Sequence, residues 1–230
     1  MVPFSFQSQE MLLVSPVPGG ASAVFWPREQ ALLVADLHLE KGSFYARAGQ
    51  MLPPYDSRET LERVAAAVRH TGARRVFALG DNFHDNHGAE RLEPHAAGML
   101  AALTRALDWV WITGNHDPEP SVEAGGTWVG ELTVSGLSLR HIARPGTNQP
   151  ELSGHFHPRL VVEARGRRIA RPCVIRSENR LILPAFGSLA GGMNAADPAI
   201  LSALQPAEAI EALLAARERL VRYPLWQKAA

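Results

Sequence analysis

Five short polar segments of this sequence carry the side chains from which proteins build divalent-metal sites. In chain order they are Asp36 with His38, Asp81, Asn115 with His116, His141, and His155 with His157. Carboxylate, amide and imidazole ligands suit Mn, Fe or Zn, and the set lacks the sulfur ligands that are usual in structural zinc sites. It is too large for one ion and fits two ions that share a bridging carboxylate, an arrangement suited to phosphoryl chemistry.

The segment Gly114-Asn115-His116-Asp117 could serve both metal binding and substrate binding from one loop. It follows the apolar run 107–113, which reads as a buried strand. Ligands of open α/β sheets bind at such strand ends, and a glycine there lets the backbone approach closely. The neighbouring amide and imidazole point in different directions. One can therefore bind a metal while the other faces a substrate.

The first half of the chain alternates between strand and helix patterns. Helices are predicted from Asp56 to Gly72, with Asp56 as N-cap and Glu59 at the reciprocal capping position, and over 94–106. This alternation indicates a parallel sheet with right-handed crossovers. The expected strands are 12–14, 23–26, 31–35, 75–79 and 109–113, with a Pro/Gly turn at 16–20.

The second half has a different pattern, in which short apolar runs follow one another without helices between them. An antiparallel or mixed sheet is expected here. A glycine-rich loop covers 184–192, and a final helix is predicted over 206–223, with Ala209, Leu213, Ala216 and Leu220 on one face. The predicted strands are 127–129, 132–134, 137–141, 160–163, 168–170, 174–175 and 181–183.

Composition narrows the class of protein. The 230 residues carry no formal net charge, so there is no overall basic signal for nucleic acid. Cys173 is the single cysteine, which excludes an internal disulfide and fits a reducing compartment. There is neither a signal-peptide pattern nor an apolar run that could span a membrane. We expect a soluble cytoplasmic protein with one domain over residues 1–230.

In their types, spacing and order, the five segments resemble the signature of the calcineurin-like metallophosphoesterase superfamily. That signature reads D-x-H, G-D, G-N-H-D/E, H and G-H-x-H, and residues 36–157 contain every part of it. The resemblance implies an α/β fold, a four-layer α-β-β-α sandwich of two mixed sheets. Within the superfamily the chain is similar to the bacterial ligase-associated DNA damage response endonucleases of the PdeM group, through the segments 35–39, 80–85, 154–158, 183–187 and 191–192.

The resemblance also implies a role for each residue. His116 faces the phosphate, where it stabilises charge or protonates the leaving oxygen, and Asp117 orients His116. Water activated by the ions attacks phosphorus in line. The ions are expected to be Mn²⁺, with Fe and Zn also compatible. Asp36, His38 and His157 hold the first ion, Asp81 bridges, and Asn115, His141 and His155 hold the second.

Other polar residues allow two interpretations. His84 and Asp85 follow the bridging candidate and either contact substrate or support the ligands. Nine arginines between 140 and 180 form either a solvated face or a track for a phosphate backbone, and Arg144 and Arg159 flank the metal motifs. Strand periodicity places Trp109 and Trp111 in the core rather than against bases, and Cys173 is expected to be a small core residue.

Three functions are consistent with these patterns. The first is a dinuclear-metal phosphodiesterase or endonuclease that hydrolyses phosphodiester bonds of DNA in bacterial DNA repair. The second is the same chemistry on a small nucleotide diester, a nucleotide-sugar pyrophosphate or a phosphoprotein. The third is a non-catalytic scaffold. A scaffold predicts lost ligands, and every ligand position is filled. The resemblance implies a ligase, helicase and exonuclease repair set as partners. About two dozen residues separate Asp117 from His141, so we expect an open site that needs a partner or a homodimer for DNA specificity.

Overall fold

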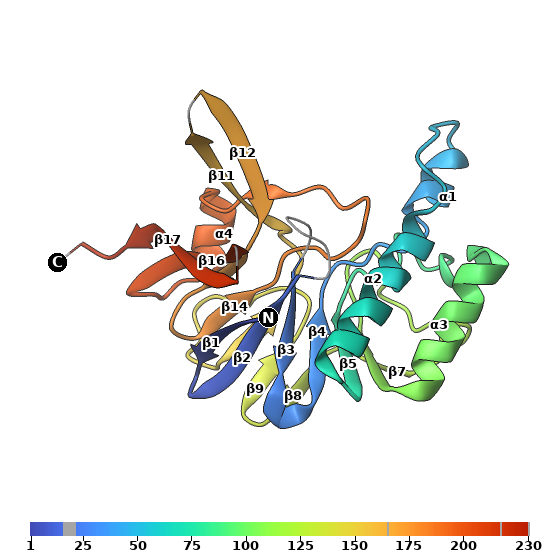
Figure 1. The fold of residues 1–230 in the computed structure, drawn as a ribbon, viewed down its shortest axis with the longest axis horizontal. Coiled ribbons are helices and arrows are strands. Elements are labelled where there is room, and N and C mark those ends of the chain that lie inside the picture. The colour runs from blue at the N-terminus through green and yellow to red at the C-terminus, as the bar shows by residue number, and fades with distance from the viewer. Residues whose placement is uncertain (16–21, 165, 217, 230) are drawn as a thin grey trace.

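Two seven-stranded sheets form the centre of the computed structural model, which describes residues 1–15, 22–164, 166–216 and 218–229 (Figure 1). The first sheet is antiparallel from β1 to β4 and parallel from β4 to β7. The parallel half confirms the strand–helix alternation read from the sequence. In spatial order the strands are β1 (Val2–Phe6), β2 (Gln9–Val14), β3 (Ala23–Trp26), β4 (Ala31–Val34), β5 (Arg75–Leu79), β6 (Asp108–Ile112) and β7 (Thr127–Val129).

The second sheet is mixed, as expected for the second half of the chain. Strand β10 pairs in parallel with both β9 and β14, and the other neighbours are antiparallel. Its spatial order is β17 (Arg219–Gln227), β16 (Ala209–Ala216), β13 (Val174–Arg176), β14 (Arg180–Ile182), β10 (Glu151–Ser153), β9 (Leu137–Leu139) and β8 (Leu132–Val134).

Helices and a small third sheet cover the outer faces of the two large sheets. Helices α2 (Asp56–Thr71) and α3 (Pro94–Ala106) pack on the first sheet. On the second sheet lie α4 (Pro198–Ala203) and the hairpin of β11 (Pro158–Ala164) and β12 (Arg167–Pro172), with β15 (Met193–Asn194) beside β11. This is the predicted four-layer sandwich. The short helix α1 (Lys41–Ala46) and 3₁₀ turns at Pro27–Glu29 and Ala89–Arg91 complete the elements.

The strands alternate their side chains between two hydrophobic cores. On β6, Trp109 and Trp111 face α2 and α3, whereas Val110 and Ile112 face the second sheet. This is the period-2 geometry of a strand buried on both faces. Both tryptophans are almost fully buried, and so is Cys173. The prediction that these three residues belong to the core is confirmed.

The predicted final helix over 206–223 is wrong. The chain forms the antiparallel pair β16 and β17 there, with Leu213 opposite Arg222. On β16, Leu213 packs between the two sheets, whereas Ala212 and Leu214 pack on the opposite face. Because this segment contributes to a core on each side, the alternating pattern of a strand prevails over the helical stripe of Ala209, Leu213, Ala216 and Leu220.

Local details also differ from the sequence predictions. Asp56 is the first residue of α2 rather than its cap, and its Oδ2 accepts a hydrogen bond of 3.0 Å from the Gly42 amide. Glu59 pairs with Arg63 instead of completing a capping box. The sequence reading missed α1, α4, β1, β10 and β15. The turn predicted at 16–20 lies outside the described residues. No described helix is long and apolar enough to cross a membrane.

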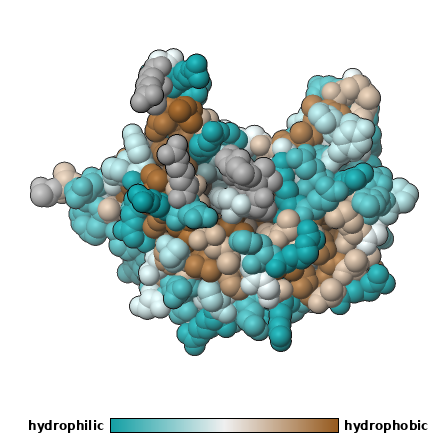
Figure 2. All heavy atoms as spheres, in the orientation of Figure 1, coloured by the Kyte–Doolittle hydropathy of each residue, from teal (hydrophilic) through white to brown (hydrophobic). Residues whose placement is uncertain are grey.

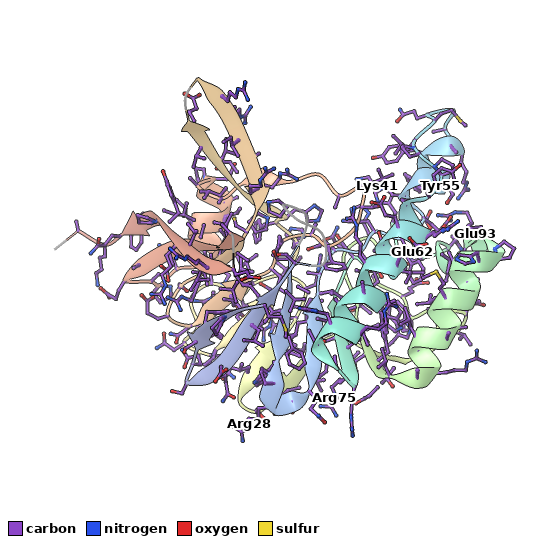
Figure 3. The ribbon with its side chains drawn as sticks, in the orientation of Figure 1. Arg28, Lys41, Tyr55, Glu62, Arg75 and Glu93 are labelled. Atoms are coloured by element: carbon purple, nitrogen blue, oxygen red, sulfur yellow. The ribbon has the colours of Figure 1, made fainter. Side chains whose placement is uncertain are left out.

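The parallel strands β4, β5 and β6 end at one edge of the first sheet. Figure 3 shows this polarity, because Arg75, where β5 begins, lies at the opposite end of the molecule from Lys41 and Tyr55. Beside the edge at which the strands end, the β11–β12 hairpin and the α1 region project from the body (Figure 1). Figure 2 shows both projections with a lower surface between them.

A buried ion-pair network anchors the segment that follows His141. The Glu151 carboxylate is fully buried, where its oxygens lie 3.0 Å from Arg180 Nε and 3.2 Å from Arg140 Nη1. The Arg180 guanidinium also donates to the carbonyls of Arg144 and Thr147, at 2.7 and 2.6 Å. These contacts connect the second sheet to the loop after β9.

Replacing Glu151 by Ala is expected to destabilise the fold by about 3–5 kcal/mol, because Arg180 would be left buried without its counter-charge and Arg140 would keep only its longer contact with Glu131. Urea unfolding monitored by circular dichroism measures this difference. The control is Arg58→Ala, which removes an exposed ion pair with Glu62 and should leave the unfolding midpoint almost unchanged. A loss as small as that control would contradict the structural role of the network.

Candidate dinuclear metal centre

The predicted ligands gather in two groups, at the ends of β4, β5 and β6 of the first sheet and in the segments that follow β9 and β10 of the second. In one group the side-chain donors of Asp36, His38 and His157 all lie within 4.8 Å of one another, and in the other those of Asp81, His141 and His155 do. Residues from the beginning and the middle of the chain thereby meet at the edge that the parallel sheet provides. Asn115 joins the second group, because its Oδ1 lies 3.0 Å from His141 Nε2.

The spacing of the donor atoms matches that of ligands around a common ion. Donors held by bonds of about 2.1 Å lie roughly 3.0–3.4 Å apart in tetrahedral or octahedral geometry. In the first group, His157 Nε2 lies 3.2 Å from His38 Nε2 and 3.3 Å from Asp36 Oδ1. In the second, His141 Nε2 lies 3.3 Å from His155 Nδ1. The residues present therefore fit two divalent ions.

Asp81 lies between the two groups and turns one carboxylate oxygen toward each. Its Oδ2 is 3.8 Å from His38 Nε2, and its Oδ1 is 3.3 Å from His141 Nε2. The Asp81 side chain is 3% exposed, so these oxygens have little access to bulk water. This is the position that a bridging ligand would occupy.

The backbone around the ligands is held in uncommon conformations. Asp36, His38, Asp81, His155 and His157 all have positive φ, between 44° and 75°. Such conformations are costly for residues other than glycine and cluster at functional sites. Hydrogen bonds between the two loops, from His38 N to Asp81 O and from Leu39 N to Asn82 O, hold this arrangement in place.

Two glycines are required by close packing around the ligands. A Cβ at Gly114 would collide with the backbone and carboxylate of Asp81, and one at Gly80, where φ is 80°, would collide with the His141 ring. The sequence predicts that Gly114 lets the backbone approach a ligand. What it approaches is the neighbouring loop that carries Asp81.

Hydrogen bonds fix which nitrogen of several imidazoles faces the centre. His141 Nδ1 lies 2.9 Å from the Leu79 carbonyl, which leaves Nε2 for a metal. His84 Nδ1 lies 3.4 Å from His38 Nδ1, on the side away from the Asp81 carboxylate. The buried His84 thus supports a ligand.

Burial keeps two of these histidines in the neutral form that binds metals. Burial, and next the charge of neighbouring His157, lowers the pKa of His38 to about 2. Burial and the neighbouring His116 lower the pKa of His84 to about 4. For Asp81, burial acts in the opposite direction, but hydrogen bonding and charge from His141 hold the pKa of the carboxyl below its usual value. His141 differs, because burial lowers its pKa but the hydrogen bond to Asp81 and the charge of Asp36 outweigh this and raise it. The centre thus contains the neutral imidazoles of His38 and His84, and an ionised carboxylate beside His141.

His116 is exposed beside the two groups and is oriented by the backbone of His84. Its Nδ1 lies 3.0 Å from the His84 carbonyl, and its ring stacks on the His84 ring at a centroid distance of 4.8 Å. With Nδ1 donating to that carbonyl, Nε2 is left available to a substrate. Its own amide donates to Asp81 Oδ1 at 2.9 Å.

The prediction that Asp117 orients His116 directly is wrong. The buried Asp117 carboxylate instead accepts hydrogen bonds from the amides of Asn82, Phe83 and Gly114, at 3.0, 3.2 and 3.1 Å, and from Asn82 Nδ2 at 2.9 Å. Burial raises the pKa of Asp117 to about 6, against these hydrogen bonds. Asp117 therefore joins the two loops that carry Asp81 and His116. The asparagine after Gly80-Asp81 is the signal that sequence reasoning did not use.

The arginines of the second half do not form one track. Arg140 and Arg180 belong to the buried network around Glu151, and Arg176 pairs with Glu211. Arg144 is 63% exposed and lies 3.0 Å from a Glu131 carboxylate oxygen. Arg165 lies outside the described residues. Arg159 is different, because it lines a cavity beside His157.

Comparison with known proteins agrees with this geometry. The model of the calcineurin-like phosphoesterases matches residues 30–160, which is more than half of the chain. The chain belongs to the calcineurin-like phosphoesterase family. It is a metal-dependent phosphoesterase, as its sequence resemblance implied. A search of curated proteins finds no match.

Among solved structures, the nuclease MPE of Pseudomonas putida is similar over almost its whole length. The two chains are 28% identical, with a TM-score of 0.70, over 97% of this chain and 98% of the nuclease. Yfce, a phosphoesterase from E. coli, has 16% identity and a TM-score of 0.40, over 85% of this chain and 98% of that one. The likeness to MPE is consistent with the predicted resemblance to PdeM-type endonucleases.

Replacing Asn115 by Ala is expected to lower the affinity of the second metal site by about tenfold or more. Replacing a residue that only supports the ligands of a metal site already lowers metal affinity by about that factor. Metal titration followed by elemental analysis should then find close to one tightly bound ion per chain in place of two. The matched control is Asn148→Ala, at an exposed asparagine of the loop after His141. Unchanged occupancy in the Asn115 variant would refute the assignment.

Proposed function

We propose that this chain is a dinuclear-metal phosphodiesterase that cleaves DNA, and that it acts in DNA repair. The observation that carries the proposal is the Asp81 carboxylate, with one oxygen facing each of two complete donor groups. Two ions a few ångströms apart clamp the attacking and leaving oxygens of a phosphoryl centre. The nucleic-acid part is supported by the likeness to the P. putida nuclease over nearly the full length of both chains.

The ligand roles in this proposal follow the two groups. Asp36, His38 and His157 would hold one ion, and Asn115, His141 and His155 the other, with Asp81 between them. When bound, the ions supply Lewis acidity and lower the pKa of water. The oxygen and imidazole ligands suit Mn, Fe or Zn, and Mn²⁺ is the ion we propose because of the resemblance to the PdeM-type endonucleases.

His116 would act on the substrate rather than on an ion. With Nδ1 held by the His84 carbonyl, its exposed Nε2 is free to meet a phosphate oxygen. There it would stabilise the charge that develops in the transition state or donate a proton to the leaving oxygen. Asp117 would serve this step indirectly, by fixing the loop that positions His116 against Asp81.

The exposure of the site bears on the choice of substrate. Asn115 and His116 are exposed, and the surface is low between the β11–β12 hairpin and the α1 region (Figure 2). An open site of this kind accommodates a long strand without enclosing it. A small diester remains the alternative substrate, which the zero net charge of the chain favours.

Replacing His116 by Ala is expected to lower kcat for phosphodiester cleavage by about 10²–10⁴-fold, while two ions still bind. Steady-state kinetics and elemental analysis of the same preparation test both parts. His87→Ala is the matched control, because His87 is an exposed histidine of the neighbouring loop. Loss of metal together with activity would instead make His116 a ligand.

The substrate can be decided with the Mn²⁺-loaded wild-type protein. Single-stranded DNA, hairpin DNA, RNA and bis(p-nitrophenyl) phosphate are compared under one set of conditions. The proposal expects cleavage of DNA as well as of the small diester. If the small diester is cleaved and both DNA forms stay intact, the DNA proposal fails and the small-substrate alternative takes its place.

A further inference from the structure

A cavity of about 170 Å³ opens beside the first group of ligands. Four segments form its walls: α2, the end of β12, the loop 184–191, and the residues from His157 onto β11. One wall is His157, which also faces Asp36 and His38. The cavity is therefore adjacent to the proposed metal centre. It is lined by Arg63, His157, Pro158, Arg159, Pro172, Pro184, Ala185, Gly187, Ser188, Ala190 and Gly191.

The charge of this cavity is positive. Two of its lining residues are arginines, Arg63 and Arg159, and none is a carboxylate. Two other hollows of the described surface each contain at least as many carboxylates as arginines, namely Glu178 and Glu211 with Arg176, and Glu59 and Glu62 with Arg58. An arginine-lined cavity without acidic walls is suited to an anion.

Both guanidiniums are held in place and keep hydrogen-bonding capacity. Arg63 is 19% exposed, and its Nη2 pairs with Glu59, which holds the guanidinium in place. Arg159 is half-buried, and its Nη2 makes one long contact of 3.4 Å with the Ala170 carbonyl. A Cβ at Gly192 would collide with the Arg159 side chain, so the glycine leaves it room.

The loop that closes the cavity is attached to both of its sides. Ser188 N lies 3.0 Å from Thr60 Oγ1, and Ser188 Oγ lies 3.0 Å from the Asp56 carbonyl, both on α2. The Gly187 amide donates to the Asp36 carbonyl at 3.2 Å. These bonds fix the position of the cavity relative to the predicted ligand Asp36. A subsite that binds one particular part of the substrate needs such a fixed position.

Size and lining limit what this cavity can hold. Pockets that enclose small organic ligands measure roughly 300–1,000 Å³ and are lined largely by apolar and aromatic groups. This one is smaller, and no aromatic residue other than His157 is in its wall, so it offers no platform on which a base could stack. A phosphate group has the size and charge that fit.

We propose that Arg63 and Arg159 bind a phosphate group of the substrate strand that neighbours the phosphate being cleaved. This inference rests on the proposed function. It makes the arginine cavity a subsite that a simple diester cannot use. A strand places a second phosphate close to the first, whereas a diester with one phosphate leaves the cavity without an anion. The group bound is a phosphate, which a strand supplies either within its backbone or at its terminus.

The test compares substrates with and without a second phosphate. Mn²⁺-loaded protein is given a dinucleotide with one phosphodiester, the same dinucleotide with an added 5′ or 3′ terminal phosphate, and a trinucleotide. The wild type is expected to prefer the substrates with a second phosphate. Arg63→Ala and Arg159→Ala should each reduce that preference in kcat/KM by about 10- to 100-fold, the range of a charge-assisted hydrogen bond.

Conservative variants and controls separate binding from folding. Arg159→Lys keeps the charge without the planar fork and should retain part of the preference. Arg58→Ala, on α2 but outside the cavity, and Arg171→Ala, exposed on β12, should keep the full preference. Metal content and melting temperature are measured for every variant. Preference for only the terminal phosphate, or for only the trinucleotide, identifies the source of the bound group.

Two results would oppose the inference and leave the proposed function standing. One is a wild type that cleaves all substrates without preferring a second phosphate. The other is an arginine variant that loses activity equally on every substrate. If the wild-type protein cleaves no phosphodiester at all, the proposed function itself has failed.

Discussion

Two buried carboxylates, Asp36 and Asp81, impose the constraint on which this site depends. Their side chains are 0% and 3% exposed, and the groups nearest to them are mainly imidazoles. A buried negative charge is costly unless it is paired or bound to a metal. Burial lowers the pKa of His38 and of His155, so these two imidazoles do not supply the missing positive charge, and only His141, whose pKa the two carboxylates raise against the effect of burial, offsets part of it. Two divalent ions would supply it, and they would also explain why donors lie at the spacing of a coordination sphere.

The fold meets this constraint by bringing the ends of three parallel strands of the first sheet together with the segments that follow β9 and β10 of the second. Positive φ values at five ligand positions and collisions expected at Gly80 and Gly114 show how tightly the loops are packed there. Asp117 holds two of these loops together through four hydrogen bonds. Rigid loops of this kind keep the ligands in place before the ions bind, which is the general requirement for a preorganised site.

Much of this arrangement could be predicted from the sequence. The ligands follow apolar runs that read as strands, and the carboxyl ends of parallel strands lie at a common edge of the sheet. The strand pattern alone therefore predicted that ligands far apart in the sequence lie close together in the fold. Where a residue's role depends on distant packing, the prediction failed. Leu213 belongs to a strand because cores lie on both sides of it, and its helical spacing did not reveal them. Asp117 was assigned to its neighbour His116, whereas its partners Asn82 and Phe83 lie on another loop.

The proposed role of Arg63 could not be predicted from the sequence either. It is one of several arginines on α2, and nothing around it in the sequence sets it apart from Arg58. Its position in the cavity arises because Ser188, far along the chain, attaches the glycine-rich loop to α2. His157 and Arg159, by contrast, are two residues apart on one segment. The backbone between them therefore fixes the position of the phosphate-binding candidate relative to the predicted metal ligand. The distance from the cleavage point to the neighbouring phosphate would thus be set by a single short stretch of backbone.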